Sequence, residues 1–274
     1  MRKTAGFFLM VFLLLHNSCN ESEQINKGND DYLYLNKLEE LIEIAGVEHN
    51  RALEYVYKAF QQAKDSGVLC KMSNNEIISF SQLQTKEFFL DSDVHFISSN
   101  RDRCMEFSDR FFNKIKRKPF VEKSADYFDI LSLVEEQDLS ESQAKYLEVL
   151  NDAINSDYDL ETLLEIFLDI KEHASLELTI EDSFIVLAAI DIGINSLTYW
   201  NSNLELWNEL LGNSQKRWFS WRQVAAYDVA GAVGGAAATA ITGGGIAAGI
   251  VGGAVGASVV CATVQIICHF GNCD

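Results

Sequence analysis

Residues 229–273 contain no Asp, Glu, Lys or Arg, and this uncharged segment restricts the possible folds more than any other feature of the chain. Eleven of the 17 glycines lie beyond residue 228. One straight helix over Val229–Val264 would be about 54 Å long, which exceeds the roughly 30 Å thickness of a bilayer's hydrocarbon core. Gly243, Gly244 and Gly245 offer a break near the middle. The sequence therefore predicts a helical hairpin with arms near 224–242 and 246–267.

Small residues recur at every fourth position of this segment, which is the pattern that lets helix backbones approach closely in lipid. It resembles the glycine zippers of pore-forming and bacteriocin-like peptides. Because each glycine costs about 1 kcal/mol relative to alanine in a lone helix in water, the segment needs a membrane or close helix partners. We expect a membrane-inserting or self-associating hairpin, and a hairpin buried inside a soluble bundle is the alternative. The expected contact residues are Gly231, Gly235, Gly245, Gly249, Gly253 and Gly256, with Gly252 and Ala257 in the same rows.

Three cations and three aromatic residues stand directly before the hairpin, in the segment Lys216–Arg222. Trp side chains favour the headgroup level of a bilayer, and Arg and Lys reach the phosphates. This pattern predicts an interfacial anchor made by Arg217, Trp218, Trp221 and Arg222. Since Gly and Ala are only weakly apolar, the segment 216–274 is a feeble stop-transfer signal and could be exported before it inserts.

The N-terminus has the features of an export signal. Arg2 and Lys3 precede a ten-residue apolar run, Gly6–Leu15, which is too short to span a bilayer. Ser18-Cys19 resembles the lipobox of bacterial lipoproteins, although His16 stands where that pattern has an aliphatic residue. We expect a signal peptide over 1–19, lipid attachment at Cys19 and a polar tether over 20–30. The alternative is an ordinary secretory signal that contains a cysteine.

The acidic residues after Cys19 are similar to the stretch that routes Bacteroidetes lipoproteins to the cell surface. We therefore expect a lipid-anchored protein of the bacterial outer membrane or cell surface. Export permits disulfides, and the candidate pairs are Cys70 with Cys104 and Cys268 with Cys273. Five cysteines remain when Cys19 is lipidated, so one thiol stays free or pairs between chains. No metal site is expected, because the tail lacks four ligands at zinc-finger spacing.

Residues 20–228 hold 20 basic and 39 acidic residues. A chain this acidic is a poor nucleic-acid binder, since phosphate neutralisation needs clustered cations. Apolar residues recur at three- and four-residue spacing through 31–215, and no alternating strand pattern appears. We predict an all-α bundle of six to eight helices followed by the Gly/Ala-rich hairpin. Gly46 and Gly67 are expected to end helices, and Ser73, Ser140, Asp159 and Thr179 to begin them.

The usual catalytic motifs are absent from the sequence: there is no HExxH, GxSxG, GxGxxG or phosphate-binding loop. His49 and Asn50 lie beside Glu48 and could in principle form an acid–base set. We interpret them instead as polar residues of the helix that carries Leu53 and Val56. The sequence therefore predicts a protein that is not an enzyme and binds no cofactor, with an unrecognised hydrolase as a distant alternative.

Three features together resemble a loose group of uncharacterised exported proteins of Bacteroidetes. They are the pattern Gly46-x-x-His49-Asn50-x-x-Leu53-x-Tyr55, the acidic helices from Ser140 to Tyr199-Trp200, and the Gly/Ala tail. The resemblance covers most of the chain after residue 40. It implies no activity and singles out only His49 and Asn50.

Two functions are compatible with these features. The first is an envelope lipoprotein with a non-catalytic binding or scaffold domain and a membrane-associating or self-associating tail. The second is an antagonistic toxin whose hairpin oligomerises into a membrane pore. Both imply membrane lipids as partners and a homo-oligomer through the glycine rows, and neither identifies a protein partner.

Overall fold

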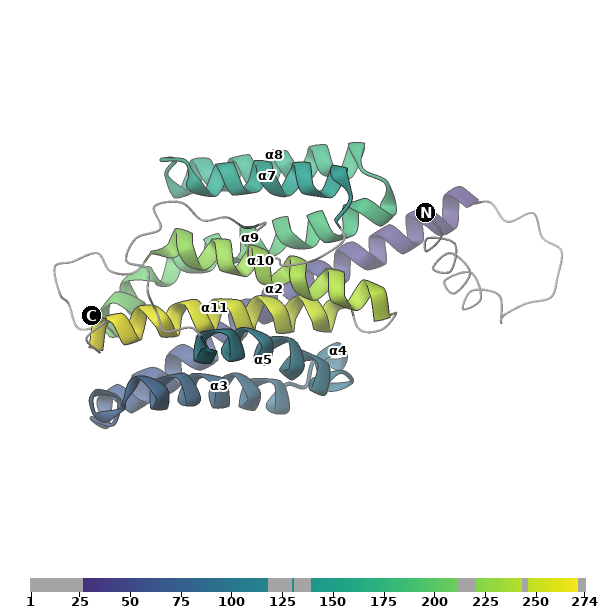
Figure 1. The fold of residues 1–274 in the computed structure, drawn as a ribbon. Helices are drawn as coiled ribbons and strands as arrows, with labels where there is room; N and C mark the ends of the chain where they lie inside the picture. The colour runs from purple at the N-terminus through teal and green to yellow at the C-terminus, as the bar shows by residue number, and fades with distance from the viewer. Residues whose placement is uncertain (1–26, 118–129, 131–138, 211–219, 243–245, 271–274) are drawn as a thin grey trace. The chain divides into compact units, whose positions relative to one another are not determined.

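The structure is a computed structural model, and it describes residues 27–117, 130, 139–210, 220–242 and 246–270 (Figure 1). Every regular element in these ranges is a helix, so the predicted all-α class is confirmed. Among the described residues, those from Lys37 onward belong to one compact unit, and those before Lys37 belong to another. The tail expected to be separate after residue 215 thus belongs to the same unit as the acidic body. The signal peptide and Cys19 lie outside the described residues.

The first helices carry charged surfaces and apolar inner faces. They are α2 (Lys27–Asp65), η1 (Leu69–Lys71), α3 (Asn74–Asp91), α4 (His95–Ser98) and α5 (Arg101–Arg117). Gly67 lies in the turn after α2 with a φ of 68°, a conformation that glycine adopts without strain. Ser73 and Glu76 form the predicted capping box of α3. Helix α2 begins at Lys27, inside the expected tether.

Gly46 does not break α2, which was the expected role of this glycine. The helix continues through it. A Cβ at Gly46 would overlap the side-chain amide of Asn195, so this glycine lets another helix approach closely. The prediction was wrong because a glycine in a helix interior costs only about 1 kcal/mol, which tertiary packing offsets.

The middle helices are α7 (Glu141–Asn155), α8 (Leu160–Glu177) and α9 (Ile180–Leu210). Ser140 and Gln143 form a second capping box, and the Asp159 carboxylate accepts the Thr162 N–H to begin α8. Helices α7 and α8 lie side by side and pack on α9 (Figure 1). These starts were predicted from the sequence and are confirmed.

The hairpin arms are α10 (Trp221–Thr242) and α11 (Ile246–Phe270), close to the predicted bounds. They pack mainly on one another. Helix α9 covers α10 on one side, and α5 and α3 cover α11 on the other, so the hairpin lies between the body helices (Figure 1). Two segments in the described ranges are long and apolar enough to cross a membrane, and both are mostly buried: Asp182–Leu210 (83%) and Ala247–Cys268 (94%).

Candidate functional site

The two arms of the hairpin meet through one of the predicted glycine rows. A Cβ on Gly235 would overlap the carbonyl oxygen of Gly249, and one on Gly253 would overlap that of Gly231. The backbones of α10 and α11 therefore touch where these four glycines lie, and any larger side chain would separate the arms. Gly245 lies outside the described residues. The contact is made within one chain.

The second glycine row faces a different helix. A Cβ on Gly252 would lie 2.8 Å from the Cα of Cys104, and one on Gly256 would lie 2.5 Å from the Cα of Ser108. Both partners belong to α5. Gly252 and Gly256 thus let α5 pack closely on α11, as the first row does for α10, so each row faces a different neighbouring helix.

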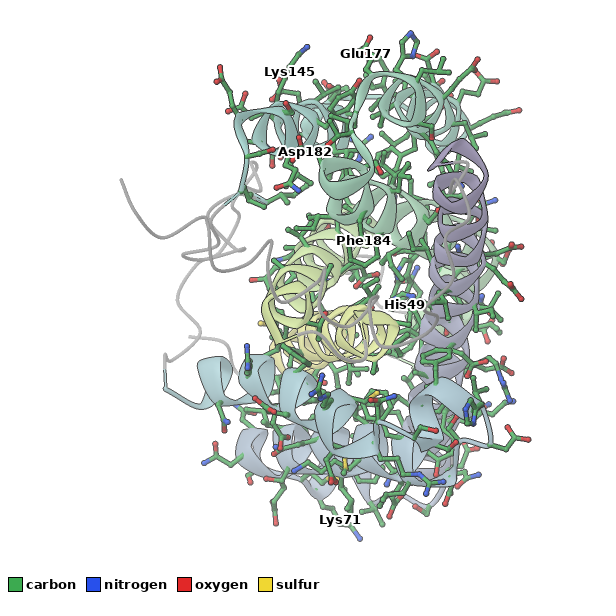
Figure 2. All side chains as sticks on the ribbon, turned by 90° about the vertical axis from the view of Figure 1, so that its right-hand side faces the viewer. His49, Lys71, Lys145, Glu177, Asp182 and Phe184 are labelled. Carbon is green, nitrogen blue, oxygen red and sulfur yellow. The ribbon has the colours of Figure 1, made fainter. Side chains whose placement is uncertain are left out.

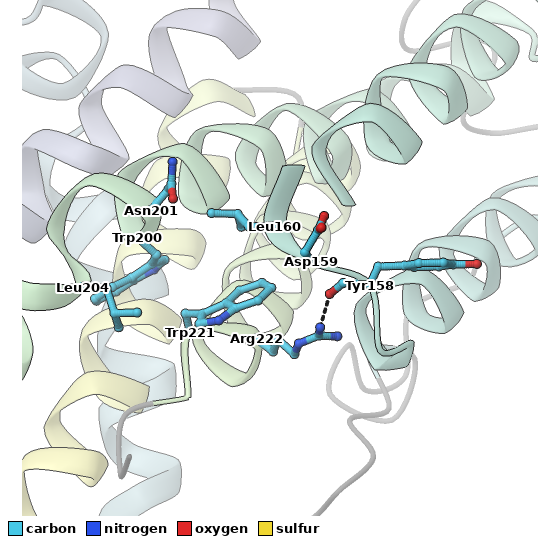
Figure 3. Close-up of a pocket in the computed structure, with 8 residues that line it drawn as sticks. All are labelled: Tyr158, Asp159, Leu160, Trp200, Asn201, Leu204, Trp221 and Arg222. Carbon is cyan, nitrogen blue, oxygen red and sulfur yellow. Dashed lines mark hydrogen bonds between the residues drawn. The ribbon is translucent and has the colours of Figure 1, made fainter. Parts of the chain in front are cut away.

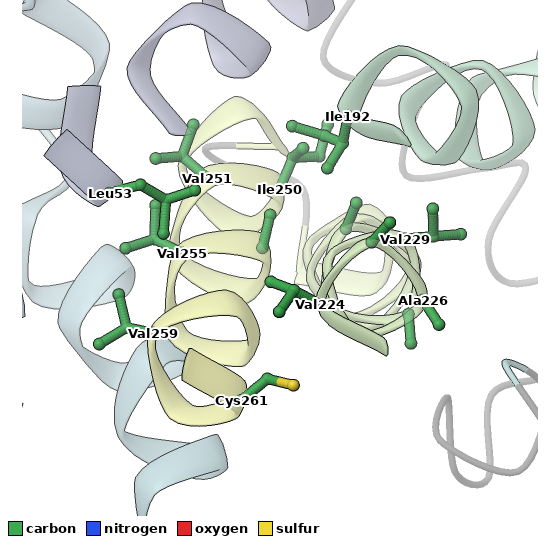
Figure 4. Packing of buried hydrophobic residues seen from close by; sticks show 14 of the residues in the cluster. Leu53, Ile192, Val224, Ala226, Val229, Ile250, Val251, Val255, Val259 and Cys261 are labelled. Carbon is green, nitrogen blue, oxygen red and sulfur yellow. The ribbon is translucent and has the colours of Figure 1, made fainter. Parts of the chain in front are cut away.

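Apolar and small side chains complete the enclosure of α11. Val251 and Val255 face Leu53 of α2, and Val259 lies on the same side (Figure 4). Thr263 donates its hydroxyl to Ser81 of α3 at 2.7 Å, with both side chains fully buried. Helices α2, α3, α5 and α10 all contribute to the cover of α11.

A buried polar cluster joins α2, α9 and α10. His49 is fully buried and lies among the core helices, whereas Lys71, Lys145 and Glu177 lie at the periphery (Figure 2). Its Nε2 atom lies 3.3 Å from Oδ2 of Asp228, whose side chain is also fully buried. Ser196 of α9 donates its hydroxyl to the same oxygen at 2.5 Å. Asp228 is therefore the junction of three helices.

Asn50 extends this cluster. Its amide nitrogen donates to the backbone carbonyl of Asn195 at 3.0 Å, and its Oδ1 lies 3.0 Å from Nδ1 of His49. Glu48 is also buried, but its Oε1 accepts from Arg51 at 2.7 Å. Because His49, Ser196 and Asp228 are all shielded from solvent, a substrate cannot reach them in this state.

The expected interfacial anchor makes contacts within the protein. The Arg222 guanidinium donates to the backbone carbonyls of Ile154, Ser156 and Tyr158, which lie at and beyond the C-terminus of α7. It also stacks on Trp221, with 4.8 Å between Cζ and the ring centroid. Arg222 therefore stabilises the end of a helix, where a cation complements the helix dipole. Arg217 and Trp218 lie outside the described residues.

A cavity of about 440 Å³ opens beside Arg222 (Figure 3). Its walls come from the start of α8, the end of α9 and the start of α10, and include Trp200, Leu204 and Trp221. The two charged residues at its rim already have partners, since Asp159 caps α8 and Arg222 binds the carbonyls after α7. The cavity is thus a mainly apolar recess in which neither Asp159 nor Arg222 is free to orient a ligand.

The predicted disulfide between Cys70 and Cys104 is not formed. Cys70 is exposed in η1, and Cys104 is buried against α11, so the two thiols point into different environments. Burial raises the pKa of Cys104 to about 12, which keeps this thiol protonated and unreactive. Cys268 lies near the end of α11, and its expected partner Cys273 lies outside the described residues. Within the described ranges, no group of three His, Cys, Asp or Glu residues could hold a metal ion.

These features define an all-α protein whose C-terminal hairpin, with an uncharged α11 arm, lies between helices that carry charged residues. A scan against protein-family models, a search of curated proteins and a search of solved structures each found no match.

Sequence reasoning selected His49 and Asn50 but did not find Asp228, Ser196 or Asn195 as their partners. These residues are far apart along the chain, so local spacing carries no sign of the contact. One signal was available: Asp228 is the last charged residue before the uncharged segment. A charge at that boundary needs either solvent or a partner.

Proposed function

We propose that the protein is an exported, lipid-anchored envelope protein whose helical body holds a membrane-inserting hairpin in a closed state. One observation carries the proposal: α11 has no charged residue and could span a bilayer, yet 94% of its apolar 18-residue window is buried beneath helices with charged outer faces. Cys19 would anchor the body at the outer membrane or cell surface, and membrane lipids would be the hairpin's partner. The body then serves as a cover, which requires no catalysis.

The composition of the cover supports this proposal. Helix α5 contains four basic and three acidic residues between Arg101 and Lys114, so it favours water over lipid. Its backbone at Cys104 and Ser108 nevertheless packs closely on α11, against Gly252 and Gly256. A helix of this kind can shield an apolar partner in water and remain at the surface when that partner enters a membrane.

A reversible lock provides the test. Ser81→Cys with Thr263→Cys replaces two hydroxyl oxygens 2.7 Å apart by two thiols, and a disulfide between them would tie α11 to α3. We expect a photoactivatable lipid in anionic vesicles to label residues 246–270 of the reduced full-length protein at some pH between neutral and mildly acidic. The oxidised protein should stay unlabelled there.

Ser81→Cys alone is the matched control, because it cannot form the lock and should be labelled whether oxidised or reduced. Absence of label from 246–270 at every pH in the reduced protein would contradict the proposal and identify the hairpin as a permanent core. Equal labelling of the oxidised and reduced double variant would also contradict it.

A pore formed by several hairpins is the second candidate, and the position of Gly252 and Gly256 favours it. This row faces α5 rather than α10, so it would become available to another copy of α11 when α5 stays at the surface. Gly256→Leu should then reduce dye leakage from vesicles when compared at equal labelling of α11. Gly249 and Gly253 are unsuitable positions for this test, since they hold the two arms together. Unchanged leakage per inserted molecule would contradict a pore built on this row.

A further inference from the structure

Asp228 lies in α10 at the boundary of the uncharged segment. Along the chain it is the last charged residue before the segment 229–273, and its side chain is fully buried. At 1.5 Å per residue it lies about 21 Å from the end of α10 at Thr242. An α10 that crosses roughly 30 Å of hydrocarbon would therefore carry Asp228 into the membrane. A charged carboxylate is costly there, so the group must be neutral when the hairpin inserts.

The contacts of His49 limit where protons can lie in the closed state. Because the Asn50 amide nitrogen donates to Asn195, its Oδ1 is an acceptor, and Nδ1 of His49 must carry a proton. Nε2 of His49 faces a carboxylate oxygen that already accepts from Ser196. This contact is favourable when one proton lies between Nε2 and that oxygen. With that one proton, the His49–Asp228 pair carries no net charge.

The other groups around Asp228 do not replace its charge. Helix α9 presents the Ser196 hydroxyl, and α11 presents the buried thiol of Cys261, which lies near enough to interact electrostatically with Asp228. On α2, Glu48 next to His49 is paired with Arg51. A further proton on the His49–Asp228 pair would therefore leave a buried imidazolium without a counter-charge, and an unpaired buried charge is strongly destabilising.

We propose that the His49–Asp228 pair is the latch of the hairpin: a proton added to this pair breaks the attraction between Asp228 and His49, releases α10 from α2, and leaves a hairpin with no charge beyond Arg222 that can enter a lipid bilayer. This inference rests on the proposed function. The same proton acts twice, because it destabilises the closed state and removes the charge that opposes insertion.

The pH dependence of lipid photolabelling at 246–270 tests the latch. For the full-length wild type with anionic vesicles, we expect labelling to rise at least about tenfold from neutral to mildly acidic pH. Asp228→Asn should be labelled at neutral pH as strongly as the wild type is at acidic pH, with little further change on acidification. The rise in wild-type labelling reflects the loss of the His49–Asp228 attraction, which Asp228→Asn lacks at every pH.

Asp191→Asn is the matched control. Asp191 is a nearly buried acid on α9 that pairs with Lys171 at 2.6 Å, outside the hairpin. This variant should keep the wild-type pH profile. If Asp228→Asn keeps that profile as well, the latch is refuted while the proposed insertion stands. If the wild type is labelled at no pH, the proposed function itself fails. Equal labelling of the wild type at neutral and acidic pH would refute the latch alone.

The engineered disulfide between α3 and α11 provides a test that remains valid even when Asp228→Asn alone fails to fold. Asp228→Asn can be prepared in the oxidised Ser81→Cys/Thr263→Cys background, which holds α11 on α3, and then reduced in the presence of vesicles at neutral pH. Prompt labelling after reduction supports the latch. Labelling that still requires acid contradicts it.

Discussion

Gly234 and Gly235 are neighbours on α10, but their surroundings differ. A Cβ on Gly235 would overlap the Gly249 carbonyl, whereas one on Gly234 would meet nothing within 4 Å. We expect Gly235→Ala to lower the free energy of unfolding by about 1–3 kcal/mol, the usual cost of overpacking. Gly234→Ala should raise it by up to about 1 kcal/mol, because alanine favours helix. Urea unfolding followed by circular dichroism measures both, and equal effects would refute the close approach of the two arms.

At the scale of single residues, the sequence predicted a residue's role correctly where its partner lies a few residues away in the chain. Ser73 and Ser140 cap their helices because the acceptor and donor lie three residues apart in the chain. Gly46 was misjudged because its role depends on Asn195, which faces it from α9. The link between His49 and Asp228 escaped prediction for the same reason. A pattern within one helix does not specify which side chain of another helix will lie against it.

The α7–α8 pair shows how one contact between elements responds to pH. The Tyr146 hydroxyl on α7 donates to Oε2 of Glu177 on α8 at 2.9 Å. Burial, together with this hydrogen bond and the charge of Glu177, raises the pKa of Tyr146 from 10.0 to about 12. The folded state therefore holds the phenolic proton more tightly than the unfolded state. This contribution to stability is complete below pH 10 and is lost as the pH rises through 12.

We expect the free energy of unfolding of the wild type to fall more steeply between pH 10 and pH 12 than that of Tyr146→Phe. Denaturant unfolding at a series of alkaline pH values measures the difference, and the phenolate absorbance of the folded protein gives an independent check. Identical slopes for the two proteins would show that the hydrogen bond to Glu177 does not hold this proton.

The bounds of the helices were predicted better than the packing of one helix on another. The bounds of α10 and α11 followed from the uncharged segment and its three glycines, and the periodicity of the body predicted its helices. Whether the hairpin would face lipid or protein could not be decided from composition, since both surroundings favour Val, Ile, Ala and Gly. The structure places it against α5, α3 and α9.

For the molecule as a whole, the buried hairpin should be the most protected part of the chain in water. Amides of α11 can exchange only when the surrounding helices separate, whereas α8 exposes Leu168 and Leu176 on its outer face (55% and 78%). We expect deuterium uptake over 247–268 to be slower than over 160–177. Comparable rates in the two segments would show that the cover opens readily without a membrane.

The order of the helices along the chain has a consequence for biosynthesis. The hairpin that fills the middle of the compact unit follows all the helices that cover it. During translation the covering helices leave the ribosome with their apolar faces still bare, and they cannot complete their packing until α11 has emerged. Such a chain stays unfolded for longer, which creates a need for chaperones and would suit the export proposed above.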